Sequence, residues 1–351
     1  MEKGTQKSTE NNEFFANATT PAMESFVFME KTAQILEIGL ATQKNIVLYG
    51  PGGHGKSEMT MSFFAENGIN PYVITMGTGM TTDRLFGGLD IPTFNNTGKI
   101  EYLVENSFMN HEYVIFEEMF DAPDFILEQL KDILSSGVFR NGTQVFPIQT
   151  KFIVCCTNRT RDEFSKNMSL KALMERFPLE LNVVWDNYTD IAYNRLLSER
   201  FGEIDPVIPF ILQEYAKNGI VISPRVAITA YSVFEKCGPE SLGFIAEFAK
   251  KPSLVSEGLK KYEASATLRN LAGLMQDHFQ LLDLNPLSTQ SELTSFNETL
   301  IEYEGMVKKI KSLKVTDDLI ETHTRVLKEH EGRLKNLTKK AMIATTMINE
   351  D

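Results

Sequence analysis

Short apolar runs alternate with amphipathic stretches through the first half of the chain. Five of the runs have the length and composition of buried strands. They occupy residues 45–49, 71–76, 113–116, 151–157 and 180–184. Strands that alternate with helical patterns are typical of a parallel sheet covered by helices on both faces. We therefore predict one doubly wound α/β domain over residues 21–185.

Two stretches interrupt this alternation, and each is predicted to form a hairpin that projects from the central sheet. In residues 91–104, the segment 95–98 (Asn-Asn-Thr-Gly) can form the turn. In residues 137–148, Asn141-Gly142 is the dipeptide favoured in type I′ turns. Neither hairpin is expected to add a strand to the sheet.

The second half of the chain is predicted to be helical. Residues 186–250 are expected to form a small helical lid, broken at Pro206, Pro209 and Pro224. In residues 251–351, one set of apolar positions recurs at spacings of three and four: Leu293, Phe296, Leu300, Tyr303, Val307 and Ile310. A second set recurs every seven residues: Ile320, Leu327, Leu334 and Ala341. With a helix N-cap offered by residues 314–318, this predicts a long antiparallel helical hairpin. Its apolar stripe is expected to form an internal core, with a binding groove as the alternative.

Composition and charge restrict the class of protein. Residues 1–20 are polar and are predicted to be a disordered tail. The net charge of −12 argues against broad, sequence-independent wrapping of nucleic acid. The three cysteines show neither disulfide nor zinc spacing, and Cys155 and Cys156 are expected to be reduced core residues. The chain has no apolar stretch long enough to span a membrane and no signal-peptide core, so we expect a cytoplasmic protein without membrane association.

A complete phosphate-binding loop follows the first predicted strand. The candidate nucleotide-binding residues are Gly50, Pro51, Gly52, Gly53, His54, Gly55, Lys56, Ser57 and Glu58. The glycines let backbone N–H groups converge on phosphate oxygens at the start of a helix. Lys56 can reach the β- and γ-phosphates of ATP, and the Ser57 hydroxyl can bind Mg²⁺. His54 is a variable position of such loops and is expected to face solvent.

Two adjacent carboxylates, Glu117 and Glu118, end the third predicted strand. The first could hold Mg²⁺, and the second could polarise the water that attacks the γ-phosphate. By themselves they could equally be an acidic pair that caps the next helix. The phosphate loop upstream favours the catalytic interpretation.

Three further polar residues complete the candidate catalytic set. Asn158 ends the fourth predicted strand, where its amide could orient the water; considered alone, it would indicate only a turn. Arg176 precedes the last strand, and Arg225 begins a helix of the predicted lid, where Pro224 suits the first turn. Guanidinium groups commonly neutralise a γ-phosphoryl group, although each arginine, considered singly, would be assigned to a surface ion pair.

The order of these motifs resembles the AAA+ ATPases and, within them, the MoxR-like group. The resemblance covers residues 21–250. Its matches are 50–57 (Walker A), 116–118 with Ala122-Pro123 downstream (Walker B), Asn158 (sensor 1), 175–177 (arginine finger), 223–225 (sensor 2), the 83–88 stretch and the two inserts. Residues 251–351 match nothing that can be assigned.

The resemblance implies a homo-oligomeric ring, usually a hexamer, with ATP bound between subunits. Arg176 would then reach the γ-phosphate of a neighbour, and Arg225 would report the nucleotide state from the lid. One departure concerns Glu117, where the family normally has Asp. The longer side chain must fold back to keep the same Mg²⁺ shell, so hydrolysis could be slow.

The sequence therefore predicts an ATP-hydrolysing motor that remodels or assembles a protein complex through its inserts. A client or adaptor could bind residues 251–351. One alternative is a motor or loader directed by DNA or RNA, which the sparse basic charge of the inserts disfavours. The other is a nucleotide-switched structural subunit with weak turnover.

Overall fold

A computed structural model describes residues 26–142, 144–165, 168–284, 287–315 and 319–350. The tail predicted for residues 1–20 lies outside this range. The described residues pack into two compact units. One comprises those up to Ile204 together with Val221–Ser232, and the other comprises Asp205–Ile220 and those from Val233 onward. The domain boundaries expected at 185 and 250 stay a prediction.

The first unit is built on a parallel sheet of five strands, as predicted. The strands are β1 (Ile46–Tyr49), β2 (Tyr72–Thr75), β5 (Tyr113–Glu117), β8 (Phe152–Thr157) and β9 (Leu179–Asn182), in the order β2-β5-β8-β1-β9. In the register, Thr75 lies beside Glu117, and Glu117 lies beside Cys156. The segments that follow the strands therefore leave the sheet at one edge, where ligands bind in such folds.

Successive side chains of the central strands enter two different cores. In β1, Val47 belongs to one buried cluster, while Ile46 and Leu48 belong to the other. This period of two explains why the strands read as continuous apolar runs, because both faces are covered.

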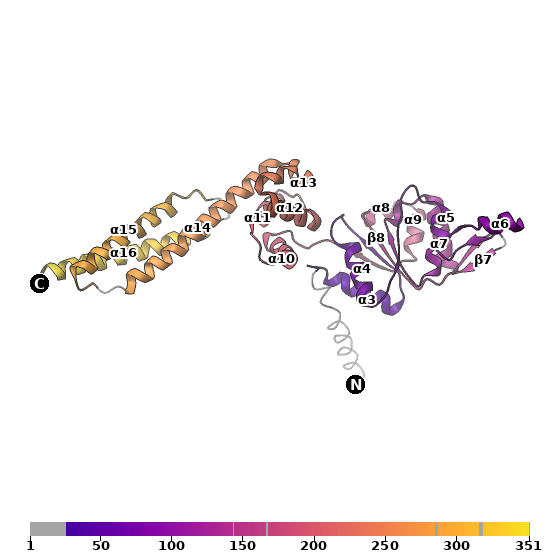
Figure 1. Ribbon diagram of the computed structural model, residues 1–351, viewed down its shortest axis with the longest axis horizontal. Coiled ribbons are helices and arrows are strands. Elements are labelled where there is room, and N and C mark those ends of the chain that lie inside the picture. The colour runs from indigo at the N-terminus through magenta and orange to yellow at the C-terminus, as the bar shows by residue number, and fades with distance from the viewer. Residues whose placement is uncertain (1–25, 143, 166–167, 285–286, 316–318, 351) are drawn as a thin grey trace, which may run out of the picture. The chain divides into compact units, whose positions relative to one another are not determined.

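Helices from different parts of the chain pack on the two faces of the sheet. The helices α3 (Glu30–Thr42) and α4 (Lys56–Glu66) pack on the face of Ile46, and α5 (Thr82–Phe86), α7 (Asp124–Ser136) and α9 (Met168–Met174) on the face of Val47. Figure 1 shows α4 and α7 on either side of the sheet. The predicted layers are confirmed.

The first insert was predicted wrongly in its secondary structure. Its expected turn lies in a helix, α6 (Ile91–Thr97), flanked by the two-residue antiparallel strands β3 (Gly88–Leu89) and β4 (Tyr102–Leu103). The Asp90 side chain accepts a hydrogen bond from the Thr93 backbone N–H and so caps the helix. No residue of α6 is buried.

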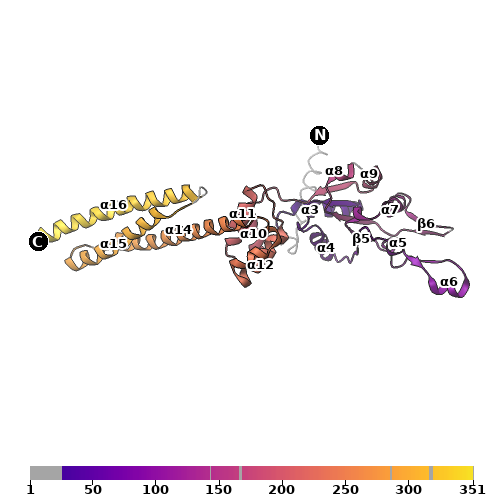
Figure 2. The same cartoon turned by 90° about the horizontal axis from the view of Figure 1, so that it is seen from above.

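The second insert is an antiparallel hairpin of β6 (Val138–Asn141) and β7 (Gln144–Pro147), separate from the central sheet. Asn141 pairs with Gln144, so the loop starts at Gly142 (φ 60°) and not at Asn141 as predicted. The Gln144 side-chain amide donates a 2.9 Å hydrogen bond to the carbonyl of Ile100 and so ties the two inserts together. Figure 2 shows both at the same end of the unit.

The helices that follow β9 are distributed over both units. The first unit holds α10 (Asp190–Phe201) and the start of α12 (Pro224–Cys237), and the second holds α11 (Val207–Lys217), α13 (Ala246–Ala249) and α14 (Pro252–Leu284). Within the second unit, α11 packs closely on α14. A Cβ at Gly258 would lie 2.6 Å from the Ile211 Cα, and Lys261 donates a 2.7 Å bond to buried Glu214.

A three-helix core, and not only a hairpin, forms the rest of the second unit. The helices α15 (Gln290–Ser312) and α16 (Ile320–Glu350) are antiparallel, since Tyr303 contacts His330 while the Ile310 carbonyl, further along α15, contacts His323, which is earlier in α16. The long helix α14 packs against both, and the Lys340 ammonium donates to the carbonyls of Leu282 and Asp283. The N-cap expected at residues 314–318 falls largely outside the described residues. Within the described chain, no helix has the length and apolarity that crossing a bilayer would require.

Candidate nucleotide-binding site

The phosphate loop joins β1 to α4 in a conformation that needs its glycines. Gly50, Gly53 and Gly55 have φ values of 134°, 77° and 80°. A Cβ added to Gly53 would lie 2.7 Å from the Ser223 Oγ, so this position also lacks space for a side chain. The loop is therefore fixed both by its backbone angles and by the segment that precedes Arg225.

Lys56, the first residue of α4, is buried beneath this loop. Its ammonium group donates to the Gly50 carbonyl at 2.8 Å, the Pro51 carbonyl at 2.9 Å and the Asn158 Oδ1 at 3.0 Å. Burial lowers its pKa, and the nearby Glu118 carboxylate opposes that shift. A buried cation with hydrogen-bonding capacity under a glycine cradle is suited to bind phosphate oxygens.

Glu118 lies at the end of β5, where the backbone turns sharply. Its φ of 51° is in the left-handed region, one of three such non-glycine residues among those the structure describes. The Asn158 side-chain amide donates to one carboxylate oxygen at 2.5 Å, and the Asn158 backbone N–H donates to the other at 3.1 Å. Asn158 thus joins Lys56 to Glu118, and these contacts bring three residues predicted from separate motifs into one cluster.

Glu117 and Ser57 line a cavity of about 170 Å³ together with that cluster. The Glu117 carboxylate accepts a 2.8 Å hydrogen bond from the Thr75 hydroxyl, at the end of the neighbouring strand. Among the described residues, no three His, Cys, Asp or Glu side chains gather as a metal cage. One carboxylate and one hydroxyl nevertheless fit Mg²⁺, which takes few protein ligands and keeps its remaining positions for water and phosphate.

A second cavity, of about 480 Å³, shares Gly53, Gly55, Glu58 and Arg225 with the first. Its lining combines the charged side chains of Glu199 and Arg200 with an apolar part: Phe26, Val27, Met29, Trp185, Leu196 and Ile228. A small polar cavity beside a larger one with an apolar part suits the two chemically different halves of a nucleoside triphosphate.

The two candidate arginines lie in different places. Arg225 lines both cavities, and its backbone N–H donates a 3.1 Å bond to the Gly53 carbonyl. Arg176 lines neither. Its guanidinium group donates to the Ser135 hydroxyl at 2.9 Å and to the Ala172 carbonyl at 2.7 Å. Within one chain, the structure therefore brings Arg225 to the phosphate loop and leaves Arg176 apart from it.

His54 does not face solvent, so that expectation was wrong. The side chain is buried, with its Nε2 2.7 Å from the Tyr188 hydroxyl and its Nδ1 3.2 Å from the Gly52 carbonyl. A carbonyl can only accept, so Nδ1 carries the proton and Nε2 accepts from Tyr188. Burial lowers the pKa of His54 below its ordinary 6.5, with Lys56 adding to the shift. The folded chain therefore binds fewer protons than the unfolded chain near that pH, and the contribution of His54 to the free energy of unfolding falls as pH falls through this range.

Removing the Tyr188 hydroxyl tests whether His54 positions the loop. Tyr188→Phe is expected to weaken ATP affinity by about 3- to 10-fold, because a lost hydrogen bond of about 1 kcal/mol leaves the buried imidazole without its donor. A titration with a fluorescent ATP analogue measures the change. Tyr102→Phe is the matched control, since the Tyr102 hydroxyl makes no hydrogen bond to the described residues. Equal affinities for the two variants would show that the loop does not depend on this contact.

Residues 13–201 match the family model described as the MoxR domain in the MoxR-vWA-beta-propeller ternary systems. The match spans more than half of the 351 residues. The chain belongs to this MoxR family of AAA+ ATPases. Nucleotide binding is a property of the family, and the MoxR domain of this chain holds its phosphate loop, Glu117, Glu118, Asn158 and Arg176 within the matched range.

Solved structures also resemble the chain at low identity. A putative ATPase from Cytophaga hutchinsonii is 14% identical, with 69% of this chain and 88% of that chain covered and a TM-score of 0.37. NtrX from Brucella abortus in complex with ADP is 14% identical, with 74% and 64% covered and a TM-score of 0.44. At these values the likenesses carry no information about activity.

Several residues of the MoxR domain's site were missed at the sequence level. Thr75, Trp185 and Tyr188 contact or line it, yet none belongs to a motif. A signal was present for each. Thr75 lies one residue before the end of the strand predicted over residues 71–76, while Trp185 and Tyr188 follow the last strand, where the chain leaves the ligand-binding edge of the sheet.

Proposed function

We propose that the chain is an ATP-hydrolysing MoxR-type ring motor that remodels or assembles a protein complex. The observation that carries this proposal is the contact series from Lys56 through Asn158 to Glu118. It places a phosphate-binding cation, a polar orienting group and a carboxylate on the wall of one cavity. Hydrolysis of a triphosphate needs these three groups near each other.

Each residue then has a role that its chemistry permits. Lys56 would exchange its bonds to the Gly50 and Pro51 carbonyls for bonds to β- and γ-phosphate oxygens. Ser57 and Glu117 would hold Mg²⁺, with Thr75 fixing one oxygen of the Glu117 carboxylate. When bound, Mg²⁺ would supply positive charge that offsets the charge of the phosphates.

Glu118 would act as the base that accepts a proton from the attacking water. Asn158 holds its carboxylate through two donors, which fixes the direction of the oxygens toward the cavity wall that both residues line. The same amide would orient the water. Arg225 would place its guanidinium group near the phosphates, since its helix starts beside Gly53.

A ring would bring Arg176 to the site of a neighbouring subunit. Within its own chain Arg176 bonds to Ser135, Ala172 and Glu175, none of which lines the cavity, and its side chain is 28% exposed. A positive charge on each subunit that is absent from that subunit's own site suits a role in trans. The number of subunits proposed is six, as is usual for the family.

Mixed rings test hydrolysis together with the seam, which is the interface where Arg176 of one subunit would meet the nucleotide site of its neighbour. Arg176→Ala and Glu118→Gln subunits should each be nearly inactive, and mixing them should restore part of the ATPase activity. Restoration occurs because some seams then combine an intact Arg176 with an intact Glu118. Phosphate release is measured across mixing ratios, with exchange of subunits checked by fluorescence energy transfer. Absence of any restoration in rings that do mix would remove Arg176 from the active seam.

The inserts favour a protein client over nucleic acid. Five large apolar side chains are exposed on them: Ile91, Phe94, Ile100, Leu103 and Val145. Their basic residues are only Lys99 and Arg140, beside Glu101 and Glu105. A surface with exposed apolar side chains and balanced charges suits protein contact and lacks the excess of cations that phosphate backbones require. Because Gln144 ties the inserts together, we propose that they move as one body when the lid rotates.

The family description also bears on the partners. The matched family is named for ternary systems of a MoxR domain with vWA and beta-propeller components. We propose that this chain assembles with proteins of these two kinds and acts on one of them.

A second candidate is a nucleotide-switched structural subunit with slow turnover. Glu117 favours it, because a glutamate at this position is one methylene longer than the aspartate that is usual in the family. Wild-type turnover no faster than that of Glu118→Gln, with ATP tightly bound, would select this candidate.

A further inference from the structure

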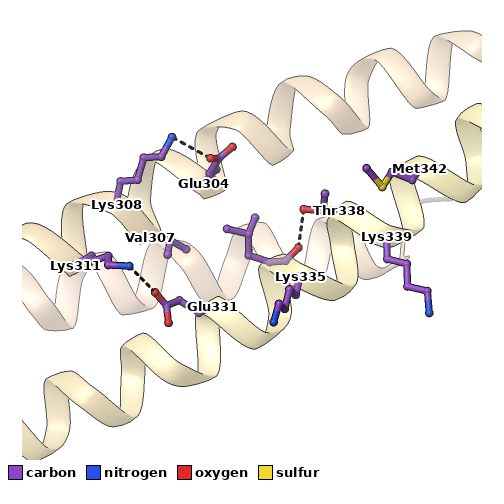
Figure 3. A pocket seen from close by; sticks show the side chains of 10 residues that line it. Glu304, Val307, Lys308, Lys311, Glu331, Lys335, Thr338, Lys339 and Met342 are labelled. Atoms are coloured by element: carbon purple, nitrogen blue, oxygen red, sulfur yellow. Dashed lines mark hydrogen bonds and ion pairs between the residues drawn. The ribbon is translucent and has the colours of Figure 1, made fainter.

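An open groove runs between α15 and α16. It has a volume of about 440 Å³, and its floor is formed by Val307 and Leu334, with Met342 at one end. Met342 is 67% exposed, although it is a large apolar side chain. Figure 3 shows residues of both helices turned toward this groove. Val307 itself is buried in the helical core, so the apolar surface that the groove presents to solvent comes from Leu334 and Met342.

The rims of the groove carry an excess of positive charge. Four lysines and two glutamates line it. Glu304 pairs with Lys308 at 2.9 Å, and Glu331 pairs with Lys311 at 3.4 Å. These two pairs account for both carboxylates (Figure 3).

The remaining two lysines of the groove have no such partner. Among the described residues, the side chains of Lys335 and Lys339 form neither an ion pair nor a hydrogen bond. A chain of net charge −12 thus presents here a local surface with two uncompensated positive charges.

We infer that this groove is a docking site for an acidic amphipathic helix of a partner protein. Apolar side chains of that helix would cover Leu334 and Met342, and flanking carboxylates would pair with Lys335 and Lys339. The lining residues of α16 run from Glu331 to Met342, a rise of about 17 Å, so three turns of helix suffice to cover it. The proposed partner site rests on the proposed function, in which the chain acts on a partner protein. Peptide binding at the groove itself needs no nucleotide.

The occupant is better matched by a protein helix than by RNA. An RNA backbone would place phosphates over the apolar floor and beside the two glutamates, both of which are unfavourable. A helix with an apolar stripe buries the floor and directs its charges only at the rims. Charge complementarity therefore selects the acidic helix.

A synthetic peptide provides the test with the full-length chain. The probe is a hydrocarbon-stapled helix of about 16 residues, long enough to span the groove, with leucines on one stripe and glutamates beside it. Fluorescence anisotropy should show binding that Lys335→Glu with Lys339→Glu weakens by about 10-fold or more. Met342→Gln should weaken it by about 3-fold, since less apolar surface is buried.

Matched controls separate the groove from general charge effects. Lys260→Glu with Lys309→Glu makes the same change in net charge at exposed lysines outside the groove, and should alter affinity by less than about 2-fold. A peptide of identical composition with scattered leucines should bind at least about 10-fold more weakly, because it has no continuous stripe. ATP affinity should be the same in both double variants. A failure of the proposed nucleotide site would therefore appear in ATP binding, and a failure of the groove proposal would appear in peptide binding.

Four results would overturn the proposal. They are absence of peptide binding, equal loss in the two double variants, preferential binding of a single-stranded RNA to the same lysines, and a change of oligomeric state in the Lys335/Lys339 variant without peptide. The last two would assign the groove to nucleic acid or to a second copy of the chain.

Discussion

Lys56→Ala is expected to weaken ATP binding by about 100-fold. The ammonium group is the only cation that the structure buries directly under the phosphate loop among the described residues, and hydrogen bonds to charged groups contribute about 1.5–3 kcal/mol each. A change of about 2.7 kcal/mol corresponds to that factor. Isothermal titration of the full-length chain with ATP and Mg²⁺ measures the affinity directly.

The same substitution also removes three hydrogen bonds inside the protein, so folding must be checked. Lys44→Ala is a suitable control because Lys44 is exposed and lies just before β1 in the same unit. Both variants should keep a cooperative thermal transition. If Lys56→Ala folds and binds ATP as the wild type does, the phosphate-loop assignment is wrong.

The five strands could be predicted because their pattern depends on local sequence alone. The central strands β1, β5 and β8 are apolar runs with alternate side chains in two cores, as at Ile46 and Val47. In the edge strand β9, Leu179 and Leu181 alternate with polar residues and pack on one core. The helix α6 could also have been predicted, since Asp90 is an N-cap residue followed by Pro92 and, at the other end, Gly98 with φ 67°. The turn-forming composition of residues 95–98 was given more weight than these helix signals.

In the C-terminal helices, a seven-residue repeat of apolar positions was not enough to predict the buried face of α16. All six apolar positions predicted in α15 are buried. In α16, Ile320 is 48% exposed, and the buried face instead includes His330, Leu337 and Ala344. The reason is that α16 contacts two helices, α14 and α15, so its buried face is wider than a single seam. Contacts with α14 are long-range and leave no period in the sequence.

The candidate site also has one part that could be predicted from the sequence and another that could not. The loop, Glu117, Glu118 and Asn158 follow strand ends, and parallel strands bring their ends together. The burial of His54 depends on Tyr188, which is 134 residues away in the sequence, so inspection of the loop alone could not reveal it. The placement of Arg176 likewise depends on Ser135, which lies in a helix on the face of Val47.

Glu118→Gln is expected to lower ATP hydrolysis by at least about 100-fold while leaving ATP affinity within about 3-fold of the wild type, because an amide cannot accept the proton of water and positioned bases contribute about 10²–10⁴-fold. The new side-chain oxygen can still accept from the Asn158 amide, so the cavity wall keeps its shape. Its NH₂ group would meet the Asn158 backbone N–H, which costs about 1 kcal/mol locally.

The assay for this variant compares phosphate release with retained ATP in the same sample. Glu105→Gln serves as the control, since Glu105 is exposed and its carboxylate has no partner among the described residues. Loss of hydrolysis with ATP retained would place the base at Glu118. Full hydrolysis by Glu118→Gln would exclude Glu118 as the base. Within the described residues, no second carboxylate accepts a hydrogen bond from Asn158, so no other base is held in the same way. The remaining candidate would then be Glu117, which reaches the same cavity from the adjacent position of β5.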